Sequence, residues 1–126
     1  MIEKITYSLK EAQNALAHLI SNKATLNDIE SAANILIESL KNEHCVFSCG
    51  NGKTVINAAK VANSTGVNVI ALTGRINPEL KCLSEVYICT PGGQFADRVQ
   101  ELHIKVLHIL IEMVERHFHP ENYKEV

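Results

Sequence analysis

Four polar side chains interrupt an otherwise apolar stretch near the carboxyl end of this 126-residue chain. They are Asp97, Gln100, Glu101 and His108, in a segment that we expect to form the last long helix, Gln94–His117. At about 100° per residue, Asp97 and His108 fall on one line of that helix, and Gln100 and Glu101 flank it. An imidazole and a carboxamide held beside a cleft could move a proton or bind a metal ion.

The same residues have a plainer interpretation, as ordinary polar breaks in a surface helix. Glu101 and Lys105 would then form a solvent-exposed ion pair four residues apart. To this interpretation we assign the neighbouring histidines, His103, His117 and His119. His108 differs from them because apolar residues surround it closely in the sequence, and burying an imidazole without a partner is costly.

A second candidate site is the stretch FSCGNGKT, residues 47–54, which ends in the Gly-Lys-Thr of phosphate-binding loops. The nucleotide-binding P-loop reads G-x-x-x-x-G-K-[ST], so its first glycine would have to fall at Phe47. Phe47 instead completes the apolar run Cys45–Phe47, and the turn would begin inside a strand. The stretch therefore does not predict a P-loop.

The elements that must position these residues alternate between helices and strands. Helical spacing of apolar residues predicts helices over residues 3–21, 25–41, 53–63, a short segment from Asn77-Pro78, and 94–117. The second of these would begin at an N-cap-like pair, Thr25 and Asp28. Short apolar runs predict strands at Cys45–Cys49, Val67–Leu72 and Val86–Cys89. Such alternation indicates an α/β protein with a parallel sheet flanked by helices, whose carboxyl edge is where ligands bind.

The last helix is apolar around almost its full circumference. A helix of this kind must be buried on every side, and a sheet of three short strands cannot cover it. We therefore predict that the chain associates with copies of itself through its helices.

The composition bounds the class of protein. Hydrophobic residues make up 46% of the chain, enough for the core of one compact domain. Twelve basic and fourteen acidic side chains give a net charge of -2, which argues against direct nucleic-acid binding. The amino terminus is polar and amphipathic, and no apolar run would span a bilayer. The cysteines lack the C-x-x-C spacing of zinc sites, so we expect a reduced, cytoplasmic protein.

Three segments are more specific than any short motif: FSCGNG at 47–52, VIALTGR at 69–75 and ADRVQELHIKVLHILIE at 96–112. Together they resemble the SIS (sugar isomerase) domain family and, within it, the bacterial phosphoheptose isomerases. The resemblance implies a flavodoxin- or Rossmann-like three-layer fold in a single SIS-like domain, 1–126. It also implies long terminal helices that assemble a homotetramer.

The resemblance assigns roles to five positions. His108 matches the histidine that acts as catalytic acid or base. Gln100 matches a residue that contacts the substrate, and in zinc-containing members both positions ligate the metal. Asn51 and Gly52 match the backbone turn that contacts substrate after the first strand, where glycine-rich amides suit an anion or sugar hydroxyls. Asp97 matches a supporting polar residue of the substrate site.

One departure from the family pattern is large. Residues 1–52 resemble the family's amino-terminal helices and first strand, and residues 53–126 resemble its carboxyl-terminal half. At the junction between Gly52 and Lys53, the segment that carries the family's catalytic glutamate, a further zinc-ligand histidine and the serine-rich phosphate loop has no counterpart.

The implied reaction converts sedoheptulose 7-phosphate to D-glycero-D-manno-heptose 7-phosphate through an enediol, a step of lipopolysaccharide heptose synthesis. It needs a base beside the carbonyl and an acid on its oxygen, and zinc could assist. Two alternatives stay open. One is a non-catalytic SIS protein like the DnaA initiator-associating protein, with the replication initiator DnaA as partner; the tail ERHFHPENY is mildly similar to its ending. The other is an inactive shortened form with exposed sheet edges.

Overall fold

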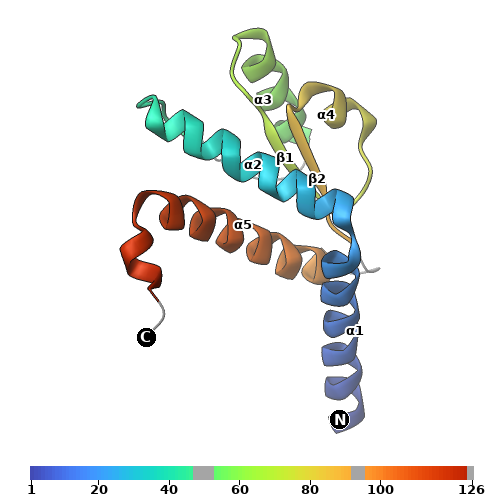
Figure 1. Cartoon of the computed structure of the whole chain (residues 1–126). Coiled ribbons are helices and arrows are strands. Elements are labelled where there is room, and N and C mark those ends of the chain that lie inside the picture. The colour runs from blue at the N-terminus through green and yellow to red at the C-terminus, as the bar shows by residue number, and fades with distance from the viewer. Residues whose placement is uncertain (47–52, 92–95, 125–126) are drawn as a thin grey trace.

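The computed structural model of the protein describes residues 1–46, 53–91 and 96–124, with only the backbone for Lys53, Ala96 and Asp97 (Figure 1). In these ranges the elements follow in the order α1 (Ile2–Ser21), α2 (Lys23–Lys41), α3 (Lys53–Ser64), β1 (Ile70–Thr73), α4 (Pro78–Leu83), β2 (Val86–Cys89), α5 (Ala96–Phe118) and a 3-10 turn, η1 (Pro120–Tyr123). None of the helices that can be described has the length and apolarity needed to cross a membrane.

The two strands form a parallel pair, in register from Ile70 opposite Val86 to Thr73 opposite Cys89. In the described part of the chain this pair is the whole sheet. The expected strand Val86–Cys89 is confirmed, whereas the strand expected at Val67–Leu72 begins only at Ile70. Of the strand expected at Cys45–Cys49, the first two residues are not in a strand and the others lie outside the described residues.

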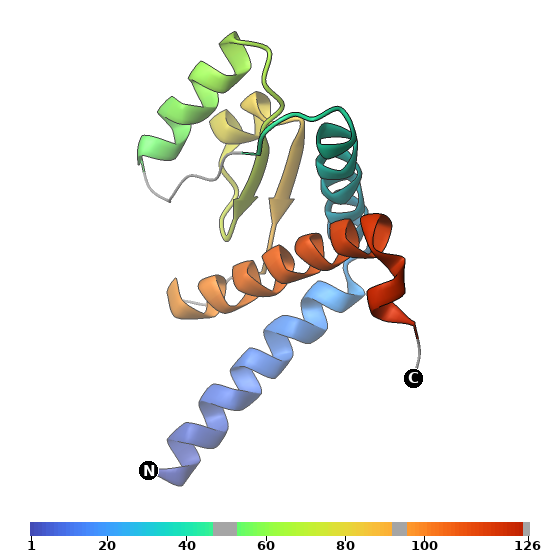
Figure 2. The same ribbon diagram turned by 90° about the vertical axis from the view of Figure 1, so that its left-hand side faces the viewer.

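The sheet separates two apolar clusters, which makes the molecule three layers thick. On one face Ile70, Leu72, Val86 and Ile88 pack with buried side chains of α1, α2 and α5. On the other face Ala71 joins side chains of α3 and α4, chiefly Ala59 and Leu80. Figure 2 shows α3 on one side of the strands and α2 on the other. The predicted α/β architecture with a parallel sheet between helices is therefore confirmed.

Asparagine side chains start two of the helices. Asn22 Oδ1 accepts a hydrogen bond from the Thr25 backbone N–H at 3.2 Å, so α2 begins at Lys23 and not at the expected Thr25–Asp28 pair. Asn22 is also the single residue between α1 and α2, with extended backbone angles. Asn77 caps α4 in the same way, with Leu80 donating to it at 3.1 Å, as the Asn77-Pro78 pair predicts.

Helix α5 buries one stripe of side chains, Leu102, Val106 and Leu110, against the sheet and α2. Near its start it also presses on the turn after β1. A Cβ atom added at Gly74 would clash with the side chain of Val99, so this close approach of helix and turn requires glycine.

The chain turns back at its carboxyl end to form what we call the C-terminal hook, η1 bound to the last turns of α5 (Figure 1). Glu115 accepts hydrogen bonds from the Tyr123 hydroxyl at 2.7 Å and from Asn122 Nδ2 at 3.0 Å. These bonds, the tyrosine's first, lower the pKa of Glu115, while the same contact raises the pKa of Tyr123. Arg116 stacks over the Tyr123 ring, 4.1 Å from its centroid.

Candidate functional site

Gln100 and His108 both lie on α5 with their side chains exposed to solvent. The close apolar surroundings expected for His108 are therefore not found within one chain. The reason is the helical period, because two residues correspond to about 200°, and His108 faces away from the buried Val106. Apolar neighbours in the sequence do not enclose a helical residue when they point in other directions.

The two candidate residues share their side of α5 with three large apolar side chains. We call this set the outer face of α5: Gln100, Ile104, Leu107, His108 and Ile111. At about 100° per residue these five positions span an arc about 100° wide. Ile104, Leu107 and Ile111 are exposed by 55%, 49% and 64%. An imidazole and a carboxamide thus lie within an apolar strip that is exposed to solvent in a single chain.

The axial distance between the candidate residues limits what they can bind together. Eight residues of helix separate Gln100 from His108, which is about 12 Å along the axis. A molecule as long as a sugar phosphate could touch both side chains. A single zinc ion, held at about 2 Å by each ligand, would require both side chains to extend toward each other.

The remaining expected site residues contribute less to this geometry. Asn51 and Gly52 lie outside the described residues, and for Asp97 the structure gives only the backbone, in the first turn of α5. Within the described ranges no group of three His, Cys, Asp or Glu side chains is placed to hold a metal ion.

Two hollows lie elsewhere on the described surface. One, of ≈ 510 Å³, sits at the carboxyl end of β2 beside the junction of α1 and α2, where Thr90 and Lys23 are among its lining residues. The other, of ≈ 810 Å³, lies between α2 and the β2–α4 side, lined among others by Asp28 and Tyr87. Neither of these two hollows is lined by Gln100 or His108.

The sequence context of His103 predicts an ordinary polar residue of a surface helix, yet this side chain is less exposed than that of His108. The Nε2 atom of His103 is buried and has no hydrogen-bond partner among the residues that the structure describes. The position lies one turn after Val99, at the border of the buried stripe, and this angular position is the signal that could have marked it.

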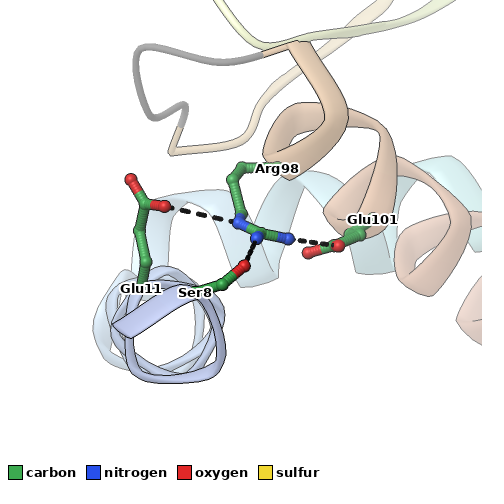
Figure 3. A network of polar contacts seen from close by, with 4 residues as sticks. All are labelled: Ser8, Glu11, Arg98 and Glu101. Carbon is green, nitrogen blue, oxygen red and sulfur yellow. Dashed lines mark hydrogen bonds and ion pairs between the residues drawn. The ribbon is translucent and has the colours of Figure 1, made fainter. Parts of the chain in front are cut away.

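Arg98 forms a charged cluster at the start of α5 (Figure 3). Its guanidinium lies 3.5 Å from Glu11 Oε2 and donates hydrogen bonds to Ser8 Oγ and Glu101 Oε1. Glu101, expected to pair with Lys105, is thus bonded to Arg98 instead. We call Arg98, Ser8, Glu11 and Glu101 the Arg98 cluster.

The fold and the placement of the polar residues define a class: an α/β protein with a parallel sheet, whose candidate ligand-binding residues lie on the helix that follows the last strand. The family model of the SIS domain matches residues 7–108, which is most of the chain. The protein therefore belongs to the SIS domain family.

Several curated relatives of this chain carry the same name, phosphoheptose isomerase. The phosphoheptose isomerase of Histophilus somni (strain 2336) is 47% identical over 70 residues, which cover 56% of this chain and 36% of the relative. That of Glaesserella parasuis serovar 5 is 42% identical over 71 residues, covering 56% and 37%. The matched part of this chain thus spans about a third of the full length of each of these two relatives.

A third relative is aligned over almost its whole length. The phosphoheptose isomerase of Aeromonas hydrophila is 27% identical over 185 aligned positions, which include 90% of this chain and 96% of the relative. Ninety per cent of 126 residues is about 113, so roughly 70 of those positions have no counterpart in this chain. The chain is similar to both ends of the relative and shorter inside.

Proposed function

We propose that this protein acts in the isomerisation of sedoheptulose 7-phosphate to D-glycero-D-manno-heptose 7-phosphate, in the cytoplasm, as part of heptose supply for lipopolysaccharide. The observation that carries the proposal is the outer face of α5, where His108 and Gln100 stand together in an exposed apolar strip. The names of the relatives supply the substrate class.

The chemistry asks for one base and one acid. A base removes the proton from C1 of the ketose, the C2 carbonyl oxygen gains a proton, and an enediol forms. The enediol collapses to the aldose when C2 gains a proton and the C1 hydroxyl loses its own. His108 is suited to one of these transfers, because imidazole exchanges protons near neutral pH. Gln100, as a hydrogen-bonding amide, would orient the sugar hydroxyls.

Zinc enters this proposal only as a bound group that would polarise the carbonyl. Gln100 and His108 would hold it, as the family resemblance implies. Two side chains about 12 Å apart along a helix axis do not by themselves fit a catalytic zinc site, which uses three protein ligands. The described residues therefore support no step through the metal.

We also propose that this chain forms a homo-oligomer in which other copies cover the outer face of α5. The family resemblance implies that this oligomer is a tetramer. Helix α1 supports self-association, because it too exposes a stripe of large apolar residues at helical spacing, including Ile2, Ile5, Leu9 and Ile20. Exposed apolar surface of this extent marks a site of association. Such an assembly would turn the open strip into a walled cleft beside His108.

The junction at residues 52/53 is where we propose that the positions without a counterpart fall. The intact mass of the native protein tests this directly. A mass of 13.9 kDa, the value for this chain, would make the shortening a property of the protein. A heavier product whose peptide map finds the additional residues between Gly52 and Lys53 would support a segment there that carries the missing acid or base and the phosphate loop.

The catalytic proposal is tested by turnover of sedoheptulose 7-phosphate by the native protein and two variants. His108→Ala should lower kcat by about 10² or more, the usual contribution of a general acid or base. His117→Ala is the matched control, since His117 is an exposed histidine near the end of the same helix, and its turnover should equal that of the native protein. Equal turnover of both variants would exclude His108 from the mechanism.

The same preparations test the non-catalytic alternative. Capture of the replication initiator DnaA by this protein, without turnover of the heptose phosphate, would favour an initiator-associating role over an isomerase. Turnover without capture would favour the isomerase.

A further inference from the structure

The Arg98 cluster joins parts of the chain that are far apart in sequence. Its hydrogen bonds from Arg98 to Glu11 and Ser8 span 87 and 90 residues. The Arg98 side chain is only 14% exposed, and it projects from the start of α5 toward α1 (Figure 3). Charge-assisted bonds to a largely buried guanidinium are stronger, and less screened by salt, than surface ion pairs.

The electrostatics of a helix disfavour an arginine in its first turn. The amino-terminal turn of a helix carries partial positive charge, which disfavours a cation there. Arg98 lies in the first turn of α5, which begins at Ala96. The two carboxylates of Glu11 and Glu101 offset this unfavourable placement. A residue that opposes its own helix dipole is explained by long-range contacts rather than by helix stability.

Helix α1 depends on these contacts for its direction. Its buried apolar anchor is Leu19, with Ala15 packed beside it, and both lie in the carboxyl-terminal half. Ser8 lies eleven residues before Leu19, about 16 Å along the axis. The amino-terminal half of α1 has no buried side chain, and its large apolar residues are exposed. The Arg98 cluster therefore fixes that half against α5.

We infer that Arg98 is a positioning residue, which holds the amino-terminal half of α1 against the first turn of α5 and thereby sets the place of Asp97 and Gln100. The consequence for catalysis rests on the proposed function, whereas the consequence for α1 does not. Small displacements of residues that orient a substrate are costly, since a shift of about 1 Å can reduce the rate by 10².

Amide hydrogen exchange of the full chain tests the structural part. Arg98→Met keeps an unbranched apolar side chain in place of the aliphatic part of arginine and removes its charge and donors. It should speed exchange over residues 2–14 by about tenfold or more, the expected loss for bonds to charged groups, and leave residues 23–41 unchanged. Arg98→Lys, which can reach fewer partners at once, should give a smaller increase over the same segment.

Arg116→Met is the matched control. Arg116 is an arginine of the same helix, and its ion pair is local, with Glu112 four residues away at 2.7 Å. Its replacement should leave exchange of residues 2–14 as in the native chain. Ser8→Ala removes one contact from the α1 side, and Glu11→Gln removes the negative charge of another. These two variants test the inference if Arg98→Met does not fold.

Kinetics with sedoheptulose 7-phosphate separate positioning from general instability. Arg98→Met should lower kcat/KM by about tenfold at a temperature where circular dichroism is native, and Arg98→Lys should recover part of it. Unchanged exchange of residues 2–14 in folded Arg98→Met, Ser8→Ala and Glu11→Gln would overturn the inference. Faster exchange in a protein whose native form has no turnover would support the role of Arg98 in fixing α1 and reject the proposed function.

Discussion

The inner and outer faces of α5 carry similar side chains and meet opposite surroundings. The inner stripe, Leu102, Val106 and Leu110, is at most 6% exposed. On the outer face, Ile104, Leu107 and Ile111 are about half exposed or more, and Gln100 and His108 stand among them. The difference shows that one chain buries only one of the two apolar sides of α5. Gln100 and His108, the residues suited to chemistry, lie on the side that remains exposed.

The largest effect should come from truncating the inner stripe. Leu102→Ala removes most of a buried side chain and leaves a cavity, so we expect the free energy of unfolding to fall by about 2–5 kcal/mol. Leu107→Ala, the same change on the outer face, should cost about 0.5 kcal/mol or less at concentrations where the chain is monomeric. Urea unfolding followed by circular dichroism measures both. Equal losses would erase the distinction between the two faces.

The contact of α5 with the turn after β1 gives the next effect. Gly74→Ala places a methyl group against Val99, and we expect a loss of about 1–3 kcal/mol in the free energy of unfolding. Val99→Ala in the same chain should restore part of that loss by making room. If the double variant is no more stable than Gly74→Ala alone, the close approach is not the cause.

The outer face can be broken without touching the core. Ile104→Glu and Ile111→Glu should each weaken self-association by about tenfold or more, because an isolated charge would be buried in the contact between copies. Helicity should be unchanged. Sedimentation velocity across a concentration series measures the effect, with Lys105→Glu on the flank of the same helix as control. A native chain that sediments as a monomer at micromolar concentration would contradict the proposed assembly.

The smallest effect should be confined to the C-terminal hook. The pKa of Glu115 is lowered in the folded chain, chiefly by the hydrogen bond from Tyr123. The contact therefore contributes its full stabilisation of the C-terminal hook at pH values above 4.5, the ordinary pKa of glutamate. This contribution is lost as the pH falls through the lowered pKa of Glu115. The protection of the amides of residues 119–124 against exchange, relative to the intrinsic exchange rate at each pH, should fall over that acid range. Glu115→Gln should reduce the pH dependence but not abolish it, because the pKa of Glu121 in the same hook is also lowered, chiefly by a backbone hydrogen bond. An unchanged profile would remove Glu115 as a source.

Much of the fold could be predicted from local patterns. The strand Val86–Cys89 and the cap at Asn77 were visible because each is specified by a few adjacent residues. β1 was expected three residues too early, because the β-branched residues Val67 and Val69 suit a strand. The paired ladder reaches only from Ile70 to Thr73, opposite the four residues of β2.

The site was harder to predict, because its features depend on direction and on distant partners. The exposure of His108 follows from which side of α5 the sheet covers, and the apolar letters around it do not reveal that. The Arg98 cluster depends on Ser8 and Glu11, nearly the whole chain away, and no local pattern connects them. The family resemblance located Gln100 and His108 but not their surroundings in this chain.

Asn22 is the one residue between α1 and α2, so the joint between these helices has no spare residue. Adding a residue there would turn the apolar stripe of α1 by about 100° relative to α2, and deleting it would turn the stripe the other way. The orientation in which two copies could meet through α1 is thus encoded in the shortness of this joint. Insertions and deletions at this joint should therefore disturb both the packing of Leu19 in the core and the way in which copies meet through α1.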